Sequence, residues 1–318
     1  MLRSPLALAF SFLLVALPAS AAEPNSGDTD PVLVALEGEL ARALEELGKK
    51  DTPPYFIGLQ VIESGTVSVV GEEGAIQGYS PMVVRVVAAD VRVGDPRLDS
   101  THPLREAVTG VPIGVASLPL GEDPEVLGRE VWSAIDSAYE KAMDRWQEVE
   151  SDRKLLVEEE LSWDLAPTEA VQELHPRVSL AGIDLAAWED AVRQASAVFG
   201  QSELPQDPSV ALFGSADTRW FVSSEGHRLR DGQLRLRATA SVDSQAEDGT
   251  MLSLFRSWDS AESDGLPGAE ELRAGVLDIL QEIGALREAP EQGPYRGPAL
   301  LSGGAAAVFF HEIFGHRV

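Results

Sequence analysis

Apolar residues recur at helical spacing in four parts of the chain. The first part follows Asp30 and Pro31, a helix N-cap residue and a proline suited to the first helical position, and is predicted to end at Pro53-Pro54. The longest covers residues 121–160 and starts at Asp123-Pro124, and the other two cover 185–200, with Gly200 as the stop, and 268–289. The apolar stripe of the first helix comprises Leu33, Leu36, Leu40, Leu44 and Leu47, and that of the longest helix comprises Val126, Val131, Ile135, Ala138 and Ala142.

The longest helix also carries aromatic residues at helical spacing. They are Trp132, Tyr139 and Trp146. Aromatic side chains in this arrangement are more typical of a core or an interface than of a cofactor site.

Three stretches have the composition of β-strands near the first helix. Residues 55–64, 65–71 and 80–95 are rich in β-branched residues, and together they predict an antiparallel meander. A second strand region covers residues 218–242, where Asp231-Gly232 predicts a hairpin turn. After that turn, apolar and polar residues alternate up to Val242, so one face of this strand is expected to be buried and the other exposed to solvent.

Helical and strand patterns occur in separate runs without a regular βαβ alternation. This order predicts an α+β fold, with mixed or antiparallel sheets and packed helices. The Pro/Gly-rich stretch 290–298 predicts a boundary between an α+β domain over 31–290 and a second unit beginning in 291–318.

The N-terminus has the three zones of a secretory signal peptide. Arg3 supplies a positive charge, residues 6–17 are apolar, and Ala19-Ser20-Ala21 is a small-residue cleavage signature. We expect a signal peptide over 1–21 with cleavage near Ala21, a flexible leader over 22–30, and a periplasmic or extracellular protein. No later stretch reaches about 18 apolar residues, so no stable membrane insertion is expected.

The net charge and composition of the chain restrict the classes of molecule that it is expected to bind. The formal net charge of −27 repels phosphate backbones, so nucleic acid is not an expected partner. The acidic residues are spread along the chain, which is typical of a solvated surface, with weak binding of divalent cations as the lesser alternative. The chain has no cysteine, and an exported protein of this kind takes no stability from disulfides.

Residues 311–316 read H-E-x-x-x-H, with His311 and His316 as candidate zinc ligands and Glu312 as a candidate general base. On a regular α-helix, positions five apart differ by about 140°, so both imidazoles cannot face one ion. A π-bulge, or a helix that ends at Gly315 and turns His316 back, would bring the two rings together. The alternative is a pair of ordinary histidines on a half-buried helix. The histidines elsewhere, His102, His175 and His227, form no motif.

The surroundings of this motif resemble the TldD/PmbA family of metallopeptidases. The stretch "YRGPALLSGGAAAVFFHEIFGH" (295–316) resembles the segment leading into that family's H-E-x-x-x-H site. Residues 82–102, containing "RVGDPRLDSTH", residues 118–143 and "FVSSEGHRLR" (221–230) are similar to family segments in the same order.

The resemblance implies a zinc-dependent peptidase with an α+β N-terminal domain and a β-rich C-terminal catalytic domain, of which 291–318 would be the start. It implies that His311 and His316 bind Zn²⁺ and that Glu312 acts as general base. It further implies peptides or unfolded protein segments as substrates, and a homodimer or a heterodimer with a PmbA-like paralogue. The family's third zinc ligand is a cysteine well downstream of the motif, and the helix carrying the motif has no stop signal before Val318. We therefore expect a chain cut just inside its catalytic domain and inactive by itself. The alternative is a non-catalytic envelope scaffold or regulatory subunit that retains the fold.

Overall fold

The computed structural model describes residues 30–104, 111–153, 163–290 and 293–317. The predicted signal peptide and all of the predicted leader except Asp30 lie outside these residues. Among the described helices, none combines the length and the apolar composition that a membrane span needs.

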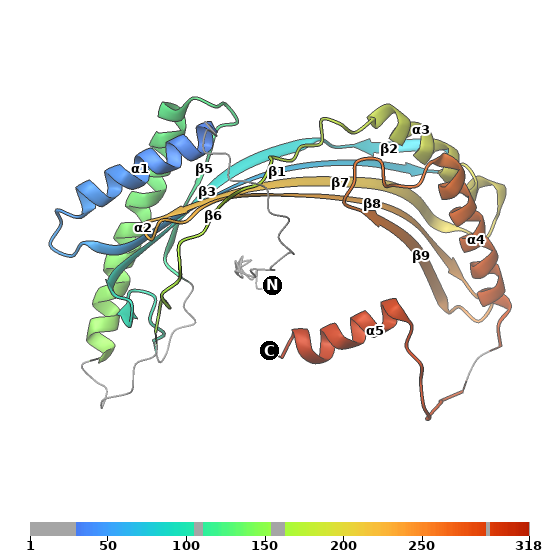
Figure 1. Ribbon diagram of the computed structural model, residues 1–318. Helices are drawn as coiled ribbons and strands as arrows, with labels where there is room; N and C mark the ends of the chain where they lie inside the picture. Colours follow the sequence, from blue (N-terminus) through green and yellow to red (C-terminus); the bar gives the residue numbers. More distant parts are fainter. Residues whose placement is uncertain (1–29, 105–110, 154–162, 291–292, 318) are drawn as a thin grey trace, which may run out of the picture.

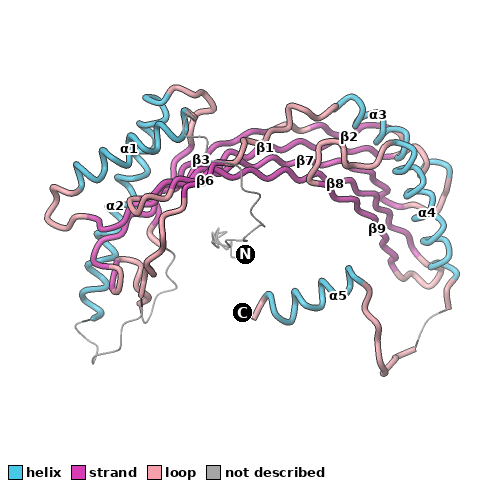
Figure 2. Tube along the Cα trace, in the orientation of Figure 1, coloured by secondary structure: helices cyan, strands magenta, loops and turns pink. Residues whose placement is uncertain are grey.

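A single curved sheet of nine strands forms the body of the described chain (Figures 1 and 2). Its centre runs in the order β3 (Met82–Asp95), β1 (Pro54–Glu72), β7 (Gln206–Ser223) and β8 (Arg228–Gln245). The shorter strands are β2 (Ala75–Tyr79) on β1, β4 (Leu98–Asp99) and β5 (Ile113–Ser117) on β3, and β6 (Gln172–Leu174) and β9 (Met251–Ser260) on β8. All of these pairs are antiparallel except β6 with β8.

Two pairs of helices cover the outer, convex side of the arch, one pair at each end (Figure 1). One pair is α1 (Pro31–Leu47) and α2 (Pro124–Arg153), and the other is α3 (Leu185–Ser196) and α4 (Ala269–Glu288), with the short 3₁₀ turn η1 (Phe199–Gln201) after α3. Odd-numbered side chains of β1 enter both cores: Leu59 packs under the first pair and Val69 under the second. Because one strand face serves two helical pairs, the sheet is the element that joins them. The predicted α+β class is confirmed.

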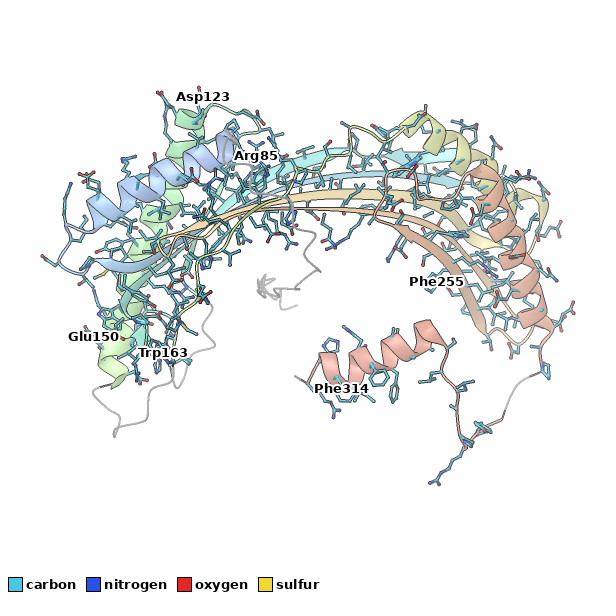
Figure 3. The ribbon with its side chains drawn as sticks, in the orientation of Figure 1. Arg85, Asp123, Glu150, Trp163, Phe255 and Phe314 are labelled. Atoms are coloured by element: carbon cyan, nitrogen blue, oxygen red, sulfur yellow. The ribbon has the colours of Figure 1, made fainter. Side chains whose placement is uncertain are left out.

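The opposite, concave face of the sheet carries no helix of either pair (Figure 1). In Figure 3, Phe255 projects from β9 toward this side, and its side chain is 73 % exposed. Alternation places short hydroxyl side chains on the same face, because each strand directs every second residue there. They are Ser64, Thr66 and Ser68 of β1, Ser209 and Ser215 of β7, Thr239 and Ser241 of β8, and Ser253 and Ser257 of β9.

The predicted meander is wrong. Residues 55–64 and 65–71 belong to one strand, because Gly65 pairs with Val83 on one side and Ala216 on the other and the ladder runs through it. β2 and β3 do not pair with each other; both lie along the same edge of β1, at different heights. The neighbour of β1 on its other edge is β7, which comes from far along the sequence.

The predicted hairpin turn at Asp231-Gly232 is also wrong. These residues lie inside β8 and pair with Arg219 and Thr218 of β7. The turn lies between Ser223 and Arg228, where Gly226 has a φ of 92°. The predicted burial after residue 234 is confirmed: Leu236, Ala238, Ala240 and Val242 are buried.

The four predicted helices are present, with corrections at their ends. α2 begins at Pro124, as the Asp123-Pro124 signal predicts, and residues 154–160, the predicted end of this helix, lie outside the described residues. α1 begins as predicted, since Asp30 accepts a hydrogen bond from the Val32 N–H at 2.9 Å, but it ends at Leu47, before the two prolines. Leu44 of its predicted apolar stripe is exposed, and the other four leucines are buried. α3 ends at Ser196 rather than at Gly200, because the chain tightens into η1 and buries Phe199.

The aromatic residues of α2 lie in or against the core. Trp132 and Tyr139 pack against the first core, and Trp146 lies against Gly94. Only one residue of the predicted α2 stripe is misplaced: Val126 is 40 % exposed, and its neighbour Leu127 is buried instead.

Candidate metal centre

The H-E-x-x-x-H motif lies at the end of a short apolar helix on the concave side of the sheet (Figure 1). α5 (Gly303–Phe310) is made of glycine, alanine, valine and phenylalanine, and neither it nor the following turn buries any residue. Phe310 and Phe314 stack on each other with ring centroids 5.6 Å apart. Side chains of this segment, including the labelled Phe314, extend into open space in Figure 3.

The helix changes its geometry at His311. Residues His311–Gly315 form a π-helical turn, η2, directly after the α-helical turns of α5. A π turn takes up more residues than an α turn, so it brings positions five apart toward one face. The distortion that the motif spacing requires is therefore present in the structure.

The turn brings the two imidazoles together. The ring centroids of His311 and His316 lie 4.7 Å apart with the ring planes at 78°. Glu312 lies beside them, with its Oε2 4.0 Å from His316 Nε2. One donor atom from each of the three side chains lies within 4.8 Å of the others, and within the described part of the chain this is the one grouping of His, Cys, Asp and Glu with such spacing.

The donor set fits zinc in chemistry and nearly in distance. Zinc binds imidazole nitrogen at about 2.0–2.1 Å and favours tetrahedral geometry, so two nitrogens on one ion stand roughly 3.3 Å apart. The donor atoms of the cluster lie within 4.8 Å of one another, so the two nitrogens need to approach by at most about 1.5 Å. The His316 side chain is 64 % exposed, so it can rotate to close this difference. Two imidazoles are one protein ligand short of the usual three, and the chain has no cysteine to supply it.

The remaining histidines lie elsewhere and interact with acidic or polar neighbours. His102 Nδ1 lies 2.8 Å from Asp164 Oδ1, and His175 Nε2 lies 2.8 Å from Glu173 Oε1. His227 accepts a hydrogen bond from the Val171 N–H at Nδ1. These contacts hold each ring against its own surroundings in the sheet domain.

A buried polar cluster that the sequence did not predict surrounds the "RVGDPRLDSTH" stretch. Asp99 is fully buried, and its Oδ2 accepts hydrogen bonds from Tyr55 Oη at 2.5 Å and from Arg92 Nη1 at 3.3 Å. The Asp99 N–H donates to Asp164 Oδ2, 65 residues away. Burial makes the largest contribution to raising the pKa of Tyr55, and the neighbouring Asp99 raises it further. The phenol therefore stays protonated and donates its hydrogen bond.

Arg92 completes this cluster. Its guanidinium donates to both oxygens of Asp90 and to the Asp164 carbonyl. Burial lowers the pKa of Arg92, but Asp90 and Asp99 more than offset it, so the pKa lies above its usual value. Each of these acids has a donor, which identifies the cluster as a structural clamp. The signal that could have found it is the density of charged residues within an otherwise apolar strand.

Comparison with known proteins gives structural likeness only. No known family profile and no curated protein matches the sequence. The solved structures that resemble the fold include TldE from Thermococcus kodakarensis, with 10 % identity, 79 % of this chain and 47 % of that chain covered, and a TM-score of 0.45. Two others are described as proposed modulators of DNA gyrase. The protein from Thermotoga maritima is 13 % identical, with 78 % of this chain and 49 % of that chain covered and a TM-score of 0.46. The protein from Bacteroides thetaiotaomicron is 14 % identical, with 76 % of this chain and 49 % of that chain covered and a TM-score of 0.42. The chain thus spans about half the length of the structures it matches.

Proposed function

We propose that this protein is a zinc-dependent peptidase of the TldD/PmbA type. The observation that carries the proposal is the π turn at His311–Gly315, which brings the side chains of His311, Glu312 and His316 together. A straight helix would separate the two imidazoles by about 140°. The sequence resemblance around this motif supports the same assignment.

The chemistry assigned to each residue follows from its donor atoms. His311 and His316 would hold the zinc ion through neutral imidazole nitrogens. When bound, zinc lowers the pKa of a water molecule and polarises a carbonyl group. Glu312 is adjacent to both imidazoles, so its carboxylate can accept a proton from the attacking water and return it to the leaving amine. A third protein ligand would have to come from residues beyond this cluster.

The proposal extends to substrate, assembly and location. The substrates would be peptides or unfolded protein segments, as the resemblance to the TldD/PmbA family implies. The protein would act as a homodimer or with a paralogue that lacks the motif. The N-terminal signature supports export, and it lies outside the described residues.

The test uses the protein expressed from its complete gene. Zinc content would be measured by mass spectrometry and cleavage with unstructured fluorogenic peptides. His316→Ala should lose stoichiometric zinc, and Glu312→Gln should keep zinc while cleavage falls by about 10²–10⁴-fold, the typical contribution of a general base. Glu203→Gln, at an exposed position in the sheet domain, is the matched control and should change neither quantity.

Two results would contradict the proposal. Absence of stoichiometric zinc in the wild-type protein would remove the metal assignment. Wild-type turnover in Glu312→Gln would remove Glu312 as the base and favour a different proton acceptor.

A further inference from the structure

Gly315 occupies the fifth position of the motif, directly before His316. Its backbone does not require glycine, because it is not among the glycines with positive φ, which are Gly74, Gly94, Gly226 and Gly249. A role as a left-handed helix cap is therefore excluded. The reason for glycine at this position must be space rather than backbone conformation.

The space beside Gly315 is filled by the imidazole of His311. A Cβ atom at residue 315 would lie 3.3 Å from His311 Nδ1 and 3.8 Å from two further ring atoms, Cγ and Cε1. The first distance is tighter than ordinary van der Waals contact, so the ring would have to shift by a few tenths of an ångström. All three of the nearest atoms belong to His311, so this ring lies directly beside the position that a side chain at residue 315 would occupy.

The same ring is the one that must meet His316. The two imidazole centroids are 4.7 Å apart, and His316 is the next residue after Gly315. A side chain at residue 315 would therefore press against the His311 ring, directly beside His316, the residue that this ring must approach. The π turn supplies the angular approach of the two rings, and the missing Cβ supplies the room for it.

We propose that Gly315 is a positioning residue for the metal centre: its lack of a side chain lets the His311 imidazole lie against the turn and reach a common ion with His316. This inference rests on the proposed function, since it assigns a role toward the same ion. It predicts that substitution of Gly315 weakens metal binding in proportion to the size of the new side chain.

The helix itself offers a matched control. Gly304 lies in the first turn of α5, and a Cβ there would meet nothing within 4 Å. Alanine or valine at 304 therefore tests the general effect of each side chain on this helix without approaching the imidazoles. The comparison is between Gly315→Ala and Gly304→Ala, and between Gly315→Val and Gly304→Val.

The experiment measures Co²⁺ and Zn²⁺ affinity of the full protein by the visible absorption of bound Co²⁺ and by competition with a chelator. Changes around metal ligands typically cost 10–100-fold in affinity. We expect about tenfold for Gly315→Ala and about 100-fold for Gly315→Val, with both Gly304 variants within about twofold of the wild type. In the metal-free protein, histidine-selective NMR should show the His311–His316 ring contact in the wild type and in Gly304→Val, and its loss in Gly315→Val.

The outcomes separate this inference from the proposed function. A wild-type protein that binds neither metal would overturn both. Metal binding in the wild type with equal affinity in Gly315→Val would overturn the role of Gly315 alone. Equal losses in the Gly315 and Gly304 variants would also overturn it, because the effect would then belong to the helix as a whole.

Discussion

The carboxylate of Asp30 has two roles, one as the N-cap of α1 and one as a buried hydrogen-bond acceptor, and one substitution can distinguish them. Its Oδ1 accepts the Val32 N–H at 2.9 Å and caps α1. Its Oδ2 accepts Trp220 Nε1 and Arg230 Nη1, both at 2.8 Å. Asp30 is 5 % exposed and Trp220 is fully buried, so these bonds tie the start of α1 to the centre of the sheet.

Asparagine is ordinarily as good an N-cap as aspartate. At position 30 it has only one oxygen for two groups of donors. If the amide oxygen stays with Val32, the amide NH₂ faces Trp220 and Arg230, and the unsatisfied buried indole N–H alone costs about 1–3 kcal/mol. If the amide flips, the cap is lost at about 1 kcal/mol and the bond to Arg230 loses its ionic character, worth about 1 kcal/mol more. The cheaper orientation therefore predicts that Asp30→Asn lowers the free energy of unfolding by about 2 kcal/mol.

A second helix cap provides the control. Asp184 caps α3 through Oδ1, which accepts the Ala187 N–H at 3.0 Å on an exposed surface. Asp184→Asn should change the free energy of unfolding by less than about 0.5 kcal/mol. Both variants would be measured by urea unfolding followed by tryptophan fluorescence. If Asp30→Asn lies within about 0.5 kcal/mol of the wild type, the shared-acceptor reasoning is wrong.

Two further predictions concern pH and packing. Burial raises the pKa of Asp30, but the hydrogen bonds from Trp220 and Arg230 outweigh it and leave the pKa below its usual value. The ionised Asp30 carboxylate therefore stabilises the fold fully above its pKa in the unfolded chain, about 3.9, and this stabilisation is lost as the pH falls through its pKa in the folded protein. The difference in free energy of unfolding between the wild type and Asp30→Asn, measured by urea unfolding, should therefore shrink below about pH 4. Gly114→Ala should lower the free energy of unfolding by about 3 kcal/mol in the same assay, because its Cβ would lie 1.9 Å from the backbone oxygen of Ala134 in α2. As the control, Gly38→Ala in α1 should raise it by about 0.5–1 kcal/mol, since a Cβ there meets nothing within 4 Å. Equal effects of the two substitutions would contradict the packing argument.

The elements that could be predicted from the sequence are those fixed by neighbouring residues. α1 follows from Asp30, Pro31 and the leucine spacing, since the cap and the buried stripe lie within the same few turns. The pairing of β1 with β7 could not be predicted, because its paired residues, from Gly71 with Val210 to Gly58 with Ser223, are 139 to 165 positions apart and no local pattern indicates the pairing. The charged residues within the apolar strand β3 were a local signal for the buried clamp around Asp99, but its partner Asp164 comes from a distant segment that no local pattern indicates.

Glycine shows where this limit lies. Gly232 predicts a turn by its local neighbours, but in the structure it allows the backbone of Pro176 and the side chain of Val178 to cross β8, at 2.8 and 2.9 Å from a would-be Cβ. Gly114 likewise makes room for α2, and neither contact can be read from adjacent residues. Gly315 differs because the group that fills its space, His311, is four residues away in the same turn. The motif spacing therefore predicted that the helix must be distorted, and the π turn was one of the two distortions that it allowed. The residues that pack against Gly232, Pro176 and Val178, lie far from the predicted turn in the sequence, so no local pattern indicated them.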